Sequence, residues 1–199
     1  MTTATPAAVK KTSPTKAAPA KATASSRVKH DVIVLLKNDH DEVKKMFKQY
    51  DKLAEKGDIK AKVKLSNKIC AELIAHSMAE EEVFYPGARS ATEDDALINE
   101  GIVEHDNAKD LIAQLQAMDP ADPMYDAKVT VLGEYITHHV DEEEEEMFPE
   151  VRKSKELDLR SLAVTFTARK QEILAQLQGD DGEIAPQQFK KLIGTPAKH

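Results

Sequence analysis

Histidine and glutamate recur in this chain in two copies of one spacing. The unit His-x-x-x-Glu occurs as His76 with Glu80 and again as His139 with Glu143, and in each copy a proline stands ten residues after the histidine. Residues four apart lie one turn apart on the same face of a helix. Each His and Glu could therefore reach one metal ion together, and the second carboxylate oxygen could bridge to another ion.

Two further histidines precede the two units at similar distances. His40 stands 36 residues before His76, and His105 stands 34 residues before His139. Four imidazoles and two carboxylates form a ligand set for two metal ions. The single cysteine, Cys70, supplies no thiolate pair, so this N/O set favours two iron ions over structural zinc. Four protein ligands for each ion would leave open positions for water, O2, NO or peroxide.

Each of the six candidate ligands lies in an apolar stripe with helical spacing. The stripes predict four long helices: one from Asp31 to a break at Gly57, one ending at Pro86, one starting near 92–95 and one ending near Pro149. A histidine or ionised glutamate that faces a helical core is costly unless it is paired or bound to metal. A single such histidine is more often structural, but four of them, one on each helix, favour a metal centre.

The long helices, short turns and lack of a strand pattern predict an all-α fold. We expect an up-down-up-down four-helix bundle with an additional C-terminal helix and disordered termini. The expected segments are a disordered basic Ala/Lys/Pro tail at 1–28, the bundle at 29–152, an accessory helix within 153–179 and a flexible C-terminal tail at 180–199.

Charge is distributed unevenly along the chain. The net charge is −7, yet residues 1–30 hold six of the 28 basic residues and no acidic one. The segment 10–29 could contact a nucleic-acid backbone weakly, with strong salt dependence, although a solubilising linker explains the same composition. No apolar run approaches the ~18 residues of a membrane span. With one cysteine, this composition leads us to expect a cytoplasmic protein without membrane association, and it leaves the oligomeric state open.

Two adjacent histidines compete for the fourth imidazole position. The distance to the proline and the apolar stripe both select His139, whereas His138 would pair with Glu142 on a neighbouring face. The acidic runs beside the ligands are either solvated faces or acceptors for imidazole N–H groups that also attract cations. Among the residues expected just behind the ligands are Lys44, Lys109, Tyr135 and Glu144.

Two glycines stand inside predicted helices. Gly101 lies about one turn before His105, and Gly133 lies about two turns before His139. Glycine in a helix interior costs about 1 kcal/mol relative to alanine. Each glycine therefore either makes space near the site or is merely tolerated.

The ligand residues resemble those of the hemerythrin-like HHE cation-binding family. The resemblance rests on His40, on His105 and on two segments, HSMAEEEVFYP at 76–86 and HVDEEEEEMFP at 139–149, and it covers about residues 30–150. It implies a four-helix bundle that holds a non-haem di-iron centre. It also implies chemistry with O2, NO or peroxide, or the sensing of iron.

The chain departs from the related oxygen carriers in one respect. Oxygen-carrying hemerythrins have five histidines, with a His-x-x-x-His pair on the third helix, but here Lys109 stands four residues after His105. The carriers also place a carboxylate five residues after the last histidine, whereas Glu143 lies four after His139 and Glu144 lies five after it. The resemblance therefore implies a more symmetric iron pair.

Three functions are compatible with the sequence. The first is a protein that binds O2, NO or H2O2 at a di-iron centre, or that senses iron or oxidative stress. The second is a di-iron enzyme with peroxide-dismutating or oxidase activity. The third is a non-catalytic module that its basic tail tethers to nucleic acid.

Overall fold

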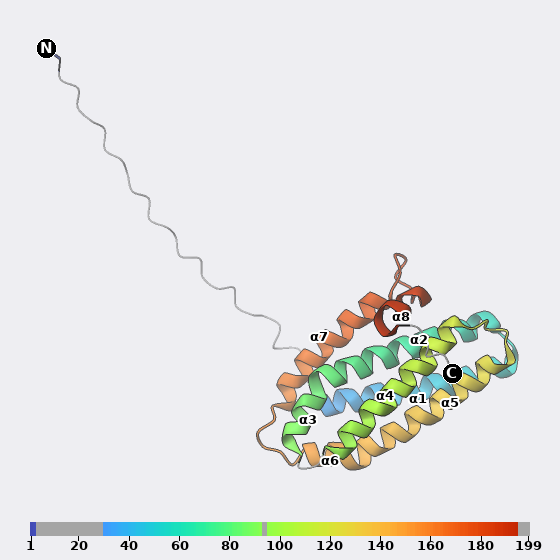
Figure 1. Cartoon of the computed structure of the whole chain (residues 1–199), viewed down its shortest axis with the longest axis horizontal. Helices are drawn as coiled ribbons and strands as arrows, with labels where there is room; N and C mark the ends of the chain where they lie inside the picture. The colour runs from blue at the N-terminus through green and yellow to red at the C-terminus, as the bar shows by residue number, and fades with distance from the viewer. Residues whose placement is uncertain (3–29, 93–94, 195–199) are drawn as a thin grey trace.

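Four long helices make up most of the protein, which a computed structural model describes for residues 1–2, 30–92 and 95–194. The helices are α1 (Val32–Lys56), α2 (Ile59–Ala79), α4 (Ala96–Ala117) and α5 (Pro123–Glu142). α1 packs against α2 and α5, and α4 packs against α5 and α2, so the four enclose a common core. Figure 1 shows neighbours in sequence running in opposite directions. In the described part of the chain no strand forms, which confirms the all-α class. The predicted tail at 1–28 lies, apart from its first two residues, outside the described residues.

Capping residues explain where the first two helices begin and end. The Asp31 carboxylate accepts a hydrogen bond from the N–H of Val34 at 3.0 Å and so starts α1. Gly57 ends α1 in the left-handed conformation, with φ at 69°, which glycine adopts without steric cost. Asp58 then caps α2 by accepting from the N–H of Ala61. The predicted helix break at Gly57 is confirmed.

Proline does not end the helices that carry the repeated units, contrary to the prediction. Both helices pass through a π turn and continue beyond the proline. The added elements are η1 (Glu80–Phe84) with α3 (Tyr85–Ala91), and η2 (Glu143–Met147) with α6 (Phe148–Val151). In a π turn each N–H donates to the carbonyl five residues back, as Tyr85 does to Glu80, so the turn holds one residue more than an α-helical turn. This extra residue accommodates the proline that follows, which has no N–H to donate. Each π turn begins at a predicted glutamate ligand.

The C-terminal region adds two helices. α7 (Leu159–Leu177) packs along α1 and α2, as an accessory helix would (Figure 1). The sequence predicts a flexible tail over 180–199, but α8 (Pro186–Ile193) forms there and packs on α4 and α7, with Phe189 only 1% exposed. A helix of this length is only marginally stable by itself. Its stability comes from packing on α4 and α7, which sequence periodicity does not reveal. Residues 195–199 lie outside the described part.

Among the described residues no helix is both long and apolar enough to cross a membrane.

Candidate metal centre

The six predicted ligands meet at one place in the core. They are His40 on α1, His76 on α2, His105 on α4, His139 on α5, and Glu80 and Glu143 at the starts of the two π turns. Each exposes no more than 7% of its surface. His139 faces the cluster, whereas the side chain of its neighbour His138 is 65% exposed.

Two groups of three side chains could each hold one metal ion, because one donor atom from each member lies within 4.8 Å of the others. The groups are His40 with His76 and Glu143, and Glu80 with His105 and His139. The carboxylates link the two groups. Glu80 Oε2 lies 3.2 Å from His76 Nε2 and 3.7 Å from His105 Nε2. Glu143 Oε2 lies at 3.3 Å and 3.5 Å from one histidine of each group.

Several buried atoms of these side chains form no hydrogen bond with any described residue. They are Nε2 of His40 and His76, both carboxylate oxygens of Glu80, and Oε2 of Glu143. Unpaired buried polar atoms are costly, and all of these belong to predicted ligands. Donor atoms that bind one ion at about 2.0–2.2 Å lie about 3–3.5 Å apart, close to the separations found here. The residues therefore fit metal ions that accept mixed imidazole and carboxylate ligation, such as iron.

Each histidine of the cluster has a carboxylate behind it. The Nδ1 hydrogen bonds pair His40 with Glu144 at 2.9 Å, His76 with Asp39 at 3.3 Å, His105 with Glu81 at 2.9 Å and His139 with Glu104 at 2.8 Å. Because Nδ1–H donates to the carboxylate, Nε2 is left to face the metal position. Each carboxylate adjoins one ligand in the sequence but bonds to a histidine of a different helix.

Sequence reasoning identified only part of this outer ring. Glu144, which the sequence analysis expected behind the ligands, lies 2.9 Å from His40 Nδ1. Asp39 and Glu104 were not predicted, although an acidic residue stands directly before both His40 and His105.

Lysines lie one step further from the metal position. Lys109 Nζ contacts Glu81 at 2.8 Å, and Glu81 in turn contacts His105 Nδ1. Lys44 instead pairs with Asp141 at 3.1 Å on the surface. Tyr135 is 51% exposed and has no hydrogen bond to a ligand within the described chain. The predictions for Lys44 and Tyr135 are wrong.

Tyr85 takes the role expected of Tyr135. Its hydroxyl donates to Glu143 Oε1 at 3.0 Å, and its ring stacks on His105 with centroids 5.7 Å apart. Phe148, the equivalent residue in the second repeat, stacks on His40 at 5.9 Å but has no hydroxyl. The two halves therefore cover their ligands with matching rings, and only one ring donates a hydrogen bond.

Gly101 makes room for that hydroxyl. A Cβ at this position would lie 2.7 Å from Tyr85 Oη and 3.4 Å from Tyr85 Cζ. The first distance is too short for a real contact, so the helix needs glycine here for Tyr85 to reach Glu143. Of the two readings of this glycine, the structure supports the one in which it makes space.

Buried carboxylates increase the proton affinity of His76. Burial would lower the pKa of His76, but the Glu80 and Asp39 carboxylates outweigh it and raise the pKa to about 10. Burial would raise the pKa of Asp39. The charges of His76 and Lys170 and their hydrogen bonds to Asp39 outweigh burial and lower the pKa to about 2. Metal binding at His76 must therefore displace a proton.

The two histidines of the second group differ in the direction of their pKa shift. Burial lowers the pKa of His105, whereas Glu143 and Glu104 overcome burial and raise the pKa of His139. The Nε2 atoms of the two rings lie 3.0 Å apart, and a proton on His139 Nε2 would be donated to His105 Nε2. A metal ion bound to both rings would replace this proton.

A cavity of about 30 Å³ adjoins the four histidines. Its apolar walls include Val43, Met46, Leu73, Ala108, Ile112 and Ile136. One water-sized sphere needs about 10–15 Å³. The cavity therefore has room for a ligand of about two heavy atoms beside the metal position.

Comparison with known proteins agrees with this geometry. The hemerythrin HHE cation binding domain matches residues 31–151, which is more than half of the chain. The chain belongs to this family. Cation binding is thus shown at the level of the family, and the two His/Glu groups are the residues that could hold the ions.

One curated relative is a DNA nickase from Nostoc sp. (strain PCC 7120 / SAG 25.82 / UTEX 2576). It is 30% identical over 147 residues, which make up 73% of this chain and 40% of the nickase. The chain thus spans less than half the length of that relative. No solved structure matches the chain.

Proposed function

We propose that this protein holds two iron ions in an up-down-up-down four-helix bundle and uses them to bind O2 or a related small oxidant, NO or peroxide, or to sense iron or oxidative stress. The main support is the set of buried donor atoms that lack hydrogen bonds. The six candidate ligands form two groups of three, each of which could hold one ion, and the two carboxylates contact histidines of both groups. Bound iron would supply open coordination positions and a change of redox state.

The chain's own residues would hold and shield the ions. Glu80 and Glu143 each contact a histidine of both groups, so each could bridge two ions. The carboxylates behind the histidines fix the ring orientation, and the rings of Tyr85 and Phe148 cover two of the imidazoles. The adjoining cavity suits a diatomic ligand or peroxide.

Metal analysis tests the proposal. Protein reconstituted with Fe(II), oxidised in air and passed over a chelating resin should retain about two iron ions per chain and show near-UV ferric absorption. His139→Ala should lose at least half of that iron, whereas the adjacent His138→Ala should retain it, because only His139 faces the cluster. Less than one tightly held iron per wild-type chain, or a clear preference for zinc, would overturn the proposal.

Peroxide dismutation is the second candidate. Tyr85 favours it, since its hydroxyl places a proton donor beside Glu143 at the edge of the ligand cluster. Oxygen evolution from H2O2 that disappears in His76→Ala would support an enzyme. A reversible spectral change with O2 and no turnover of peroxide would support a binding protein instead.

A further inference from the structure

A second group of potential ligands lies on the surface, one helix face away from the metal centre. His138 Nε2 lies 3.2 Å from Glu142 Oε1 and 3.7 Å from Glu104 Oε1. One donor atom from each of the three residues falls within 4.8 Å of the others. The side chains are 65%, 26% and 21% exposed respectively, so an ion in solution can reach them.

Charge distinguishes Glu104 from the other three carboxylates behind the histidines. Each of the others forms an ion pair with a lysine: Glu144 with Lys37 at 2.9 Å, Glu81 with Lys109 at 2.8 Å and Asp39 with Lys170 at 2.8 Å. In the described chain Glu104 has no lysine or arginine within ion-pair distance, and neither has Glu142. Glu142 also lies in the field of Glu100 and Glu146.

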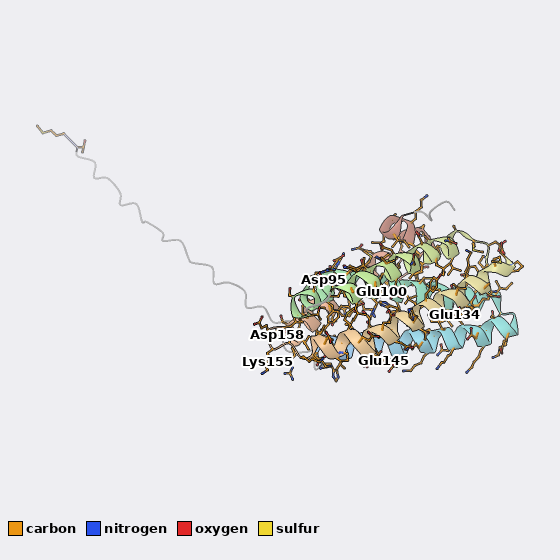
Figure 2. The ribbon with its side chains drawn as sticks, turned by 60° about the horizontal axis from the view of Figure 1, so that its bottom comes forward. Asp95, Glu100, Glu134, Glu145, Lys155 and Asp158 are labelled. Carbon is orange, nitrogen blue, oxygen red and sulfur yellow. The ribbon has the colours of Figure 1, made fainter. Side chains whose placement is uncertain are left out.

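Figure 2 shows the side of the molecule on which α4 and α5 lie, with Glu100, Glu134 and Glu145 on that side. This side carries exposed carboxylates, and among the described residues no lysine or arginine pairs with Glu104 or Glu142 on it. Asp39 pairs with the ammonium group of Lys170, whereas the described residues provide no such ammonium group for Glu104.

The sequence repeat explains why only one half has this arrangement. The positions equivalent to His138 and Glu142 are Ala75 and Ala79 on α2, and both alanines are fully buried. α7 packs along α2 and supplies Lys170 to Asp39 there. No helix of the described chain covers the corresponding face of α5, and this exposed face carries a histidine and a glutamate four residues apart instead.

We propose that Glu104, His138 and Glu142 form a third metal site, which takes a divalent first-row cation such as Zn2+ or Mn2+. One imidazole and two carboxylates are typical ligands for these ions, and three protein ligands leave positions for water. The donor separations of 3.2 and 3.7 Å are close to those around one ion. Glu104 Oε2 accepts from His139 Nδ1 at 2.8 Å, so the outer ion would share a carboxylate with the buried centre.

Zinc titration of the iron-loaded protein tests the third site, because iron already fills the buried positions. Wild-type protein should bind about one added Zn2+ per chain by isothermal titration calorimetry, with iron content and ferric absorption unchanged. His138→Ala and Glu142→Gln should each weaken this binding at least about tenfold, a loss of about 1.4 kcal/mol. Both positions lie at the surface, so the folded state should be retained, which circular dichroism verifies.

Glu100→Gln is the matched control, since it removes the same charge near Glu142 without removing a ligand. Its effect should stay below about threefold. No added Zn2+ in the wild type, or an equal loss in Glu100→Gln and His138→Ala, would overturn the third site. If the protein takes up no iron, zinc counted in metal-free protein still decides the question, because the wild type should bind one ion more than His138→Ala.

Discussion

Substituting Gly101 by alanine tests how tightly the helices position the Tyr85 hydroxyl. The new Cβ would lie 2.7 Å from Tyr85 Oη, so the ring must move and its 3.0 Å hydrogen bond to Glu143 is lost. Glycine to alanine in a helix interior gains about 1 kcal/mol. Losing a hydrogen bond to a buried charged group costs about 1.5–3 kcal/mol. Gly101→Ala should therefore lower the free energy of unfolding by about 0.5–2 kcal/mol.

The sign should reverse when the hydroxyl is absent. In Tyr85→Phe the nearest remaining ring atom lies 3.4 Å from the alanine Cβ, at the edge of an ordinary contact. Gly101→Ala should then stabilise the variant by up to about 1 kcal/mol. The four proteins of the double-mutant cycle, compared by urea unfolding in the metal-free state, should give a coupling energy of about 1.5–3 kcal/mol.

Gly133→Ala provides the control for the cycle. Gly133 also lies inside a long helix, but its Cβ would meet the ring of Phe47 at 3.2 Å and no hydroxyl. Combined with Tyr85→Phe, it should be additive within about 0.5 kcal/mol. A coupling between Gly101→Ala and Tyr85→Phe no larger than that of the control would show that the hydroxyl is not held in place by α4, and the reasoning would fail.

Three further predictions concern protons, ligand access and the tail. His76 has a pKa of about 10 in the folded metal-free protein against an ordinary 6.5. Its protonation therefore contributes fully to stability below pH 6.5, and the free energy of unfolding should fall as the pH rises toward 10. A His76→Gln variant measured by urea unfolding should lack this decline. Ala108→Val narrows the cavity and should slow the binding of NO in stopped-flow spectra while iron content stays unchanged; equal rates would argue against the cavity as the ligand position. Deleting residues 1–30 should abolish any salt-sensitive DNA retardation, since the rest of the chain is strongly acidic; retardation that persists would place the contact elsewhere.

The inward positions of the six candidate ligands could be predicted because helix periodicity determines them. A side chain in the apolar stripe of a long helix must face the core, and the repeat identifies His139 over His138. The π turns could not be predicted. A proline in a helical pattern normally ends the helix, and only the backbone shows that an extra residue allows α2 to continue through Pro86. The π turn also begins at Glu80, where the ligand leaves the regular helix.

The partners behind the ligands were harder to predict because they belong to other helices. Asp39 precedes His40 in the chain but hydrogen-bonds to His76, and Glu144 follows Glu143 but hydrogen-bonds to His40. Sequence spacing describes neighbours on one helix, whereas these pairs depend on how two helices meet. The placement of Tyr85 beside Glu143 depends in the same way on Gly101 in α4.

The same difference between helices would make the two proposed metal positions unequal although their candidate ligands repeat. A carboxylate that accepts from an imidazole N–H makes the ring a stronger donor to metal. A lysine that shares the carboxylate weakens this effect, and Lys170 does so for Asp39 behind His76. Glu104 behind His139 has no such lysine among the described residues. We therefore expect the position at His139 to stabilise ferric iron more than the position at His76 does. Filling the outer site at His138 with zinc should reduce this difference, because the added cation then competes for Glu104 as the lysine does for Asp39.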